Sequence, residues 1–518
     1  MNYASIKYFV ISILTVISIV LTLVVLEISI RWQEKIFPPN AYKPPSIVKS
    51  ITDEVLLRKI IQDRGVSTNT FNIYYFGESS MWGEPYIDTI PVLVEKMLGG
   101  KINNKEIKWV NMASPGIGYC EVDRRLKQIV NNKNIYFPSL IIIYSGHNEF
   151  LQYQDGIGFS FQGNKTNWMG KAVLESRLAH KIAQIFKIYK LEIDDRKFFD
   201  KPVVSIEWYS ETINKYVNMV NSTISYLQEN EVPVIVSTVV GNYADFEPNR
   251  SVFTANELKK NEFKNYMDKG LELTKQGKTE EALFSYQKAL KIDDKFAETH
   301  YRLGQIYRKL GHNDKAWTEF MLAVDNDMMP LRATSVQNDF IRNIRESSYV
   351  KVIDPVMYLK QSSMKDTIGY NYFFDGIHPN LEGYRLISEM FAKKIAKLYK
   401  NESAFVPLTK ADAEKIFNSD QGLYNAYSSR ADWLIRIATW RYDPTQRLND
   451  ADYFLTKAHS IFEGNAYWNL SKMTIYYLRN DIKTAKIFYK NATDLNPKEA
   501  REYLKNNWIN QVITRALN

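Results

Sequence analysis

Three residues of this chain have the types and the settings needed to transfer an acyl group. Ser79 stands in Gly77-Glu78-Ser79-Ser80, directly after an apolar run that predicts a strand. A serine at the turn from a strand to a helix exposes its hydroxyl beside the positive end of the helix dipole. A plain helix N-cap is an equal alternative for Ser79 taken alone. No G-x-S-x-G pattern occurs, which argues against the nucleophile elbow of α/β-hydrolases.

A base and an acid for this serine occur together near residue 375. The turn Asp375-Gly376-Ile377-His378-Pro379-Asn380 lies between the last predicted strand and a long amphipathic helix. The spacing lets the carboxylate bind one imidazole nitrogen while the other nitrogen takes the Ser79 proton. Alternatively, Asp375 shapes the turn and His378 caps the helix. The pairing with a strand-end serine favours the triad.

Donors for a developing oxyanion are available in two further turns. Gly116, in NMASPG, has no side chain to keep a substrate from its backbone N–H, and Asn148, in SGHNE, carries a side-chain amide. Each could be an ordinary turn residue. Together with the backbone N–H of Ser79 they fit one acyl-transfer site.

These turns follow nearly continuous apolar runs separated by amphipathic stretches. Such runs are typical of strands covered by helices on both faces, and their alternation with helices predicts a doubly wound parallel α/β sheet. The carboxyl ends of such strands form the ligand crevice, which would bring the turns together. The runs are residues 72–77, 107–113, 139–146, 232–241 and 349–355.

Two further segments carry a repeat of 34 residues, the period of the tetratricopeptide helix pair. In residues 263–327 the matched pairs are Gly277 and Gly311, Ala282 and Ala316, Tyr286 and Phe320, and Ala289 and Ala323. Beyond residue 400 they are Ala451 and Ala485, Leu455 and Tyr489, and Ala458 and Ala492. The sheet domain is therefore expected to hold a helical insert and to precede a helical tail. Residues 155–205 show no clear pattern and are expected to form loops or a lid.

The N-terminus predicts a single uncleaved membrane anchor. Residues 8–26 form a stretch of 19 residues without a charge, which is the length of a membrane-spanning helix and longer than the apolar core of a signal peptide. Residues 37–46 contain four prolines and predict a semi-rigid spacer. We expect a short cytosolic tip and the bulk of the chain on the extracytoplasmic (periplasmic) side.

Composition limits the other possibilities. A net charge of +9 over 518 residues, without a long basic block, argues against nucleic acid. Cys120 is the only cysteine, so neither an intramolecular disulfide nor a cysteine-ligated metal site can form. Acidic residues and histidines show no metal-binding spacing. We therefore expect no metal and no cofactor.

The blocks GESS, NMASPG, SGHNE and DGIHPN resemble, in order, those of the SGNH (GDSL-like) hydrolase superfamily, and the whole chain is similar to a bacterial membrane-anchored type with a tetratricopeptide insert. The resemblance implies a flavodoxin-like three-layer fold with Ser79, Asp375 and His378 as triad and Gly116 and Asn148 in the oxyanion hole. Glu78 departs from the usual Asp, and GHNE from the usual G-x-N-D, which leaves the substrate class open. Arg332, in MPLRA, could bind an anionic substrate, although a surface salt bridge is the favoured role.

The expected domain organisation follows from these patterns. Residues 1–32 form the cytosolic tip and anchor, 33–50 the spacer, and 258–328 the repeat insert. Residues 51–257 and 329–400 form the two parts of the hydrolase domain, and 401–518 the all-helical C-terminal region.

The expected function is a serine-dependent esterase or O-acyltransferase that works through an acyl-enzyme. Its substrate would be an acyl ester, with acetyl favoured, of an envelope or exported glycan or lipid. The repeats would bind a protein partner. The alternative is a membrane-anchored repeat scaffold with a catalytically silent SGNH fold.

Overall fold

The computed structural model describes residues 54–150, 206–362, 367–417, 420–438, 444–463 and 465–506. The predicted anchor, the proline-rich spacer and the unpatterned segment 155–205 lie outside these residues. Among the described residues, no helix combines the length and the apolar character that a membrane crossing needs.

The core is one six-stranded sheet in the order β2-β3-β1-β4-β5-β6. The pairs β3–β1, β1–β4, β4–β5 and β5–β6 are parallel, and only the short β2 is antiparallel to its neighbour. The five parallel strands have the flavodoxin-like order, and each overlaps one of the five predicted apolar runs. The strands are β1 (Phe71–Gly77), β2 (Lys101–Ile102), β3 (Lys105–Asn111), β4 (Leu140–Tyr144), β5 (Val234–Ser237) and β6 (Val350–Ile353).

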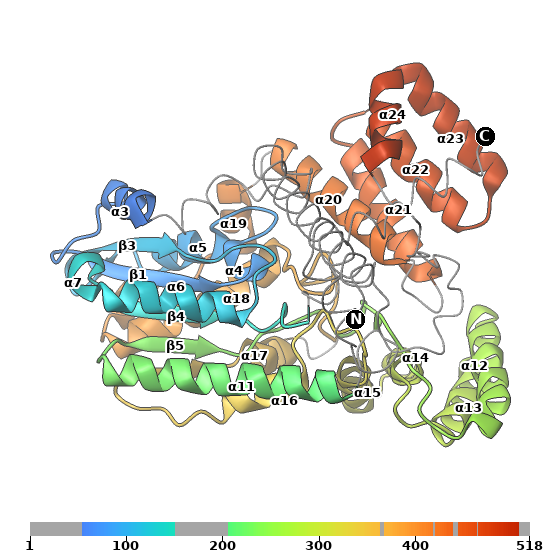
Figure 1. Cartoon of the computed structure of the whole chain (residues 1–518), viewed down its shortest axis with the longest axis horizontal. Coiled ribbons are helices and arrows are strands. Elements are labelled where there is room, and N and C mark those ends of the chain that lie inside the picture. Colours follow the sequence, from blue (N-terminus) through green and yellow to red (C-terminus); the bar gives the residue numbers. More distant parts are fainter. Residues whose placement is uncertain are drawn as a thin grey trace, which may run out of the picture. The chain divides into compact units, whose positions relative to one another are not determined.

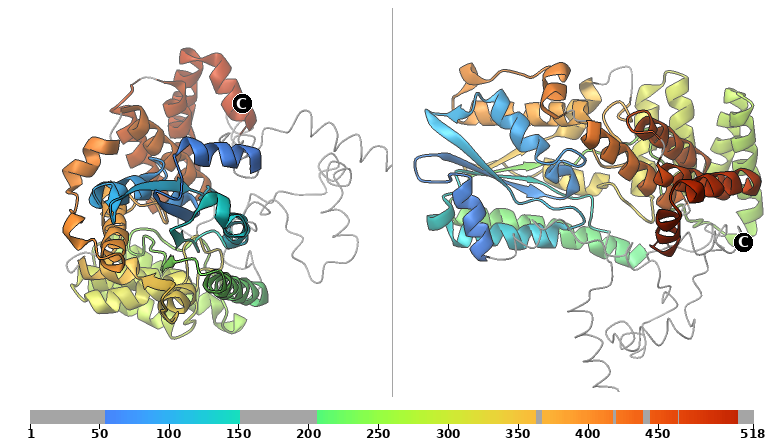
Figure 2. Two further views of the ribbon diagram at one scale, coloured as in Figure 1. Left: turned by 90° about the vertical axis from the view of Figure 1, so that its left-hand side faces the viewer. Right: turned by 90° about the horizontal axis from the view of Figure 1, so that it is seen from above.

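Helices cover both faces of this sheet, so the predicted three-layer α/β class is confirmed (Figures 1 and 2). On one face α6 (Tyr119–Asn131) packs against β1 and against α11 (Ile206–Glu229). On the other, α5 (Thr89–Met97) packs against β3 and α18 (Leu381–Leu398). All seven residues of β1 are buried, which explains its continuous apolar pattern. Further helices of this part are α3 (Glu54–Asp63), α4 (Ser79–Trp82), α7 (Lys133–Tyr136), α16 (Ser335–Arg342) and α17 (Pro355–Ser362).

Between β5 and β6 the chain forms two antiparallel helix pairs with the predicted repeat. A Cβ on Gly270 or Gly304 would approach within 2.6 Å of the ring of Tyr286 or Phe320, respectively. Glycine on the first helix of each pair therefore makes room for the aromatic ring on the second. The helices are α12 (Lys260–Lys275), α13 (Thr279–Leu290), α14 (Ala297–Lys309) and α15 (Asn313–Asp325), with a 3-10 turn before them at Glu257–Lys259.

Among the described residues after α18, every regular element is a helix, and buried polar contacts attach this region to the sheet domain. Arg447 is fully buried, pairs with Glu247 at 3.2 Å and donates a 2.7 Å hydrogen bond to Oδ1 of Asn249. Tyr370 donates to Asp450 at 2.7 Å. The helices are α19 (Lys410–Phe417), α20 (Asp420–Ala438), α21 (Thr445–His459), α22 (Ala466–Leu478), α23 (Ile482–Leu495) and α24 (Pro497–Asn506), with a 3-10 turn at Glu402–Ala404.

Candidate active site

Ser79 is the first residue of α4, immediately after β1 ends at Gly77. A Cβ on Gly77 would lie 2.2 Å from the carbonyl oxygen of Tyr144, so only glycine lets β1 and β4 end side by side here. Glu78 occupies the N-cap position. The alternative role of Ser79 as a plain N-cap is therefore not adopted, and its side chain is available for another contact.

Ser79, His378 and Asp375 form one continuous hydrogen-bonded chain. Nε2 of His378 lies 2.7 Å from Oγ of Ser79, and Nδ1 lies 2.8 Å from Oδ2 of Asp375. The other carboxylate oxygen of Asp375 accepts the backbone N–H groups of Ile377 and His378, at 2.9 and 2.8 Å. These bonds orient the carboxylate toward the imidazole. The helix-cap alternative for His378 does not apply, because the Asn380 side chain caps α18.

The three side chains are almost removed from solvent. Ser79, His378 and Asp375 expose 5%, 7% and 0% of their surface, respectively. Burial would by itself raise the pKa of Asp375, but the charges of His378 and Arg430 outweigh it and hold this pKa far below its usual range. Asp375 therefore stays ionised at neutral pH and can orient the imidazole.

Glu78 connects the Ser79 turn to the Asn148 loop. Its carboxylate accepts bonds from Oγ of Ser145 (2.8 Å) and from the backbone N–H groups of Gly146 (2.9 Å) and His147 (3.0 Å). Burial, with a further contribution from Glu149, raises the pKa of Glu78 to about 8, against the opposing effect of these bonds. Glu78 thus holds two parts of the site together.

A hydrogen bond joins Asn148 to the residue that follows Gly116. Asn148 is 4% exposed, and its Nδ2 donates to the carbonyl of Ile117 at 3.0 Å. Ile117 follows Gly116, which has a φ of +74° that favours glycine. Their role toward an oxyanion stays a prediction.

The surface salt bridge favoured for Arg332 is wrong. Arg332 is 2% exposed, and its Nη1 donates to the carbonyls of Asn242 (2.7 Å) and Phe246 (2.5 Å). The buried guanidinium thus connects two backbone carbonyls near the triad through hydrogen bonds. Burial, partly opposed by Asp327, lowers its pKa to about 10, so it stays charged at neutral pH.

Two residues next to the triad were missed from the sequence. Arg430, on α20, donates to Oδ2 of Asp375 in a very short contact, and its Nη2 donates to Oε2 of Glu84 at 2.9 Å. Oε2 of Glu84 also lies 3.4 Å from Nε2 of His378. Glu84 lies four residues after the GESS motif, a closeness in sequence that gave a weak signal. Arg430 carried none, because it lies in a helix that the sequence assigns to the tail.

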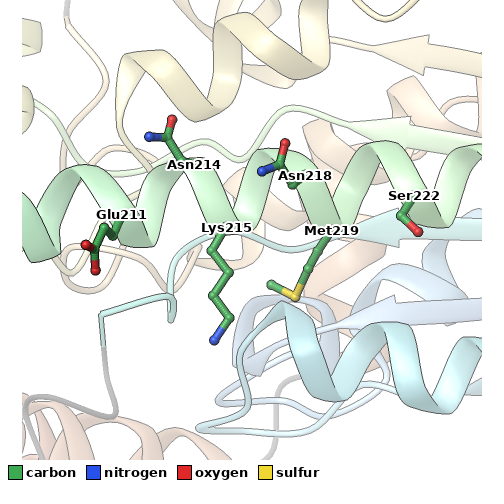
Figure 3. A pocket seen from close by; sticks show the side chains of 6 residues that line it. All are labelled: Glu211, Asn214, Lys215, Asn218, Met219 and Ser222. Atoms are coloured by element: carbon green, nitrogen blue, oxygen red, sulfur yellow. The ribbon is translucent and has the colours of Figure 1, made fainter.

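One surface pocket, of about 460 Å³, lies along α11 and contains none of the triad residues (Figure 3). Lys215 and Met219 point to one side of the helix, and Asn214 and Asn218 point to the other. The positive charge of Lys215 partly opposes the effect of burial on Glu149, whose pKa is raised to about 7. Lys215 therefore contributes to the electrostatics of the Glu78–Glu149 pair from outside the site.

The order of the parallel strands is that expected from the SGNH resemblance. Family models for "TPR repeat" and "Tetratricopeptide repeat" match residues 270–311 and 297–327, so these residues are tetratricopeptide repeats. No curated protein matches the chain.

Among solved structures the chain is similar to acylhydrolases. A putative acylhydrolase from Bacteroides fragilis is 12% identical, with 67% of this chain and 99% of that chain covered and a TM-score of 0.27. A lipase/acylhydrolase from Enterococcus faecalis is 12% identical, with 66% and 100% covered and a TM-score of 0.26. A GDSL-like lipase from Bacteroides thetaiotaomicron is 10% identical, with 66% and 97% covered and a TM-score of 0.27. TM-scores this low define no residue correspondence, so the site rests on its own contacts.

Proposed function

We propose that the chain is an SGNH-type ester hydrolase or O-acyltransferase with Ser79 as nucleophile. The observation that carries the proposal is the unbroken chain from Asp375 through His378 to Ser79, with distances of 2.8 and 2.7 Å. Distances in this range let a base take a proton from a hydroxyl without rearrangement.

The proposed reaction has two halves. Ser79 Oγ attacks the ester carbonyl while its proton passes to Nε2 of His378, and that proton then leaves with the alcohol. Water, or a hydroxyl of an acceptor, next gives its proton to His378 and attacks the acyl carbonyl. The acyl–Oγ bond then breaks, and His378 returns the proton to Oγ of Ser79. Asn148, Gly116 and the N–H of Ser79 would stabilise the oxyanion. The donor we propose is an acyl ester, with acetyl favoured, on an envelope or exported glycan or lipid.

Covalent labelling tests the nucleophile. The full chain is treated with a fluorophosphonate probe beside Ser79→Ala, with Ser114→Ala as a matched control, because Ser114 is also buried but lies in the Gly116 turn. We expect labelling of the wild type and of the control and none of Ser79→Ala. Undiminished labelling of Ser79→Ala would reject the assignment. Hydrolysis of p-nitrophenyl acetate with and without a sugar acceptor then separates hydrolase from transferase.

The location of the chain is part of the proposal: a single N-terminal anchor with residues from about 33 onward outside the cytoplasm. Cys120 is the only cysteine and is exposed, so it reports on topology without further engineering. A membrane-impermeant maleimide should label it in spheroplasts as fully as in lysed cells. Labelling only after lysis would place the domain in the cytoplasm.

The tetratricopeptide repeats favour a second function, the binding of a protein partner. Phe284, on the second helix of the first pair, leaves 61% of its surface exposed. We expect Phe284→Glu to weaken capture of a cross-linked partner. Leu258→Glu, at a residue 90% exposed in the 3-10 turn before the repeats, serves as control. Equal capture by both variants would argue against this surface.

A further inference from the structure

The imidazole of His378 lies between two carboxylates, one more than the proposed reaction needs. Asp375 contacts Nδ1 at 2.8 Å, and Glu84 lies 3.4 Å from Nε2, the nitrogen that must accept the Ser79 proton. A carboxylate beside each nitrogen favours protonation of both, and an imidazolium cannot act as a base. Without a compensating positive charge, the two carboxylates would oppose the role of His378 as a base.

Arg430 is placed to prevent this. Its guanidinium donates to Oδ2 of Asp375 and, at 2.9 Å, to Oε2 of Glu84, and it lies 2.6 Å from Nδ1 of His378. Arginine carries its charge at every working pH. Two carboxylates and one guanidinium leave a net charge of −1 around the imidazole, the same as a lone triad aspartate supplies.

Arg430 comes from α20, in the helical region that follows the sheet domain, and is 4% exposed. Its element is held against the site by neighbouring aromatic contacts, such as that of Tyr427 with Phe374, whose ring centroids are 6.1 Å apart. The C-terminal helices therefore contribute a charged group to the triad itself.

We propose that Arg430 is a positioning residue of the triad, which binds Asp375 and Glu84 together and keeps the imidazole of His378 free to take the Ser79 proton. This inference rests on the proposed function. It makes the C-terminal region part of the active site.

Other groups near His378 do not supply the same charge. His147 faces it from the loop after β4, but burial first, and the charge of His378 second, lower the pKa of His147 to about 3, so it is neutral. Tyr384, on α18, donates to the Glu84 carbonyl at 2.8 Å, and burial raises its pKa well above 10, so it is neutral too. The balance around the imidazole thus depends on Asp375, Glu84 and Arg430.

The experiment compares kcat/KM of the full chain for p-nitrophenyl acetate from pH 5 to 9. In Arg430→Ala the acid limb of this profile, where kcat/KM rises with pH, should move to higher pH by about one to two units. The value of kcat/KM at pH 6 should therefore fall roughly tenfold or more. Glu84→Gln in the same chain should return the limb close to its wild-type position. Glu84→Gln alone should move the limb to lower pH, and Arg430→Lys should give an intermediate shift, because lysine keeps the charge without the fork.

A matched control separates the effect of the Arg430 charge from the effect of loosening the C-terminal helices. Arg447→Lys loosens another buried contact of the C-terminal helices while leaving the triad charges intact, and should lower kcat/KM equally at every pH. If Arg430→Ala behaves in that way, or if Glu84→Gln does not restore the limb, the inference is wrong. Should Arg430→Ala fail to fold, an unmoved limb in Glu84→Gln overturns the inference by itself.

A second readout does not depend on activity. In protein labelled with ¹³C at histidine Cε1, the His378 signal is assigned by its loss in His378→Gln. It should titrate at higher pH in Arg430→Ala than in the wild type, and equal titration would overturn the inference. An inert wild type that the fluorophosphonate probe does not label would instead count against the proposed function.

Discussion

Ser80 Oγ donates a 2.8 Å hydrogen bond to the backbone carbonyl of Ile377, although the two residues are 297 positions apart in the chain. Ser80 follows the nucleophile, and Ile377 precedes the base. Both are buried, at 2% and 6% exposure. This single bond ties the Ser79 turn to the His378 turn and helps to set the 2.7 Å distance between the two functional atoms.

We therefore expect Ser80→Ala to lower both stability and turnover. The Ile377 carbonyl would be left buried without this donor, at a cost of about 1–2 kcal/mol in the free energy of unfolding. Because the His378 turn would lose its tie to Ser79, kcat for p-nitrophenyl acetate should fall several-fold with little change in KM.

Tyr74→Phe is the matched control for Ser80→Ala. Tyr74 also donates from a buried hydroxyl to a backbone carbonyl, that of Tyr136 at 2.7 Å, but away from the turns of the site. Tyr74→Phe should lose about as much stability as Ser80→Ala, while its kcat should stay at the wild-type value. An equal fall in kcat for both variants would mean that the Ser80 effect is only general destabilisation.

Asp375→Asn tests the acid of the triad. The amide would no longer fix the tautomer that presents an unprotonated Nε2 to Ser79, so kcat should fall by roughly 10³–10⁴-fold. Because the pKa of Asp375 is held far below its usual range, protonation of Asp375 should not limit wild-type activity at any pH down to about 4. Activity within tenfold of the wild type would show that the contact with His378 is not used.

The strands and the grouping of Ser79, Asp375 and His378 could be predicted from the sequence because their signals are local. The β1 run and the turn Asp375-Gly376-Ile377-His378 can each be recognised from a few consecutive residues. Arg430 could not be predicted, because its helix reads like any amphipathic tail helix and its partners lie 52 residues and more away. The burial of Arg332 was missed for the same reason: only tertiary packing brings the carbonyls of Asn242 and Phe246 to it.

The acid pair Glu78 and Glu149 predicts that stability falls as pH rises. Their pKa values are raised to about 8 and about 7, first by burial, from an ordinary value of 4.5. The folded chain then holds protons that the unfolded chain has already released, so this stability is complete below about pH 4.5 and is lost as pH rises toward 8.

Glu149→Gln checks this prediction. It removes one titrating group and the charge that helps to raise the pKa of Glu78. Urea unfolding of the variant should therefore show a smaller loss of stability between pH 5 and pH 8 than the wild type, by at least about 1 kcal/mol. A steeper slope for Glu149→Gln would contradict the sign.

The last prediction concerns the packing of the repeats. A Cβ on Gly304 would lie 2.6 Å from the Phe320 ring, which is fully buried. Gly304→Ala should therefore overpack this helix pair and cost about 1–3 kcal/mol in the free energy of unfolding, even though alanine favours helix more than glycine does. Thermal unfolding followed by circular dichroism measures the loss.

Phe320→Leu provides the test of that cause. A smaller side chain opposite residue 304 should make room for the methyl group, so Gly304→Ala should cost less in the Phe320→Leu background than in the wild type. Strict additivity of the two substitutions would show that the glycine is needed for a reason other than the ring. The pH profile of kcat/KM should not change in either variant, because both substitutions exchange one uncharged side chain for another.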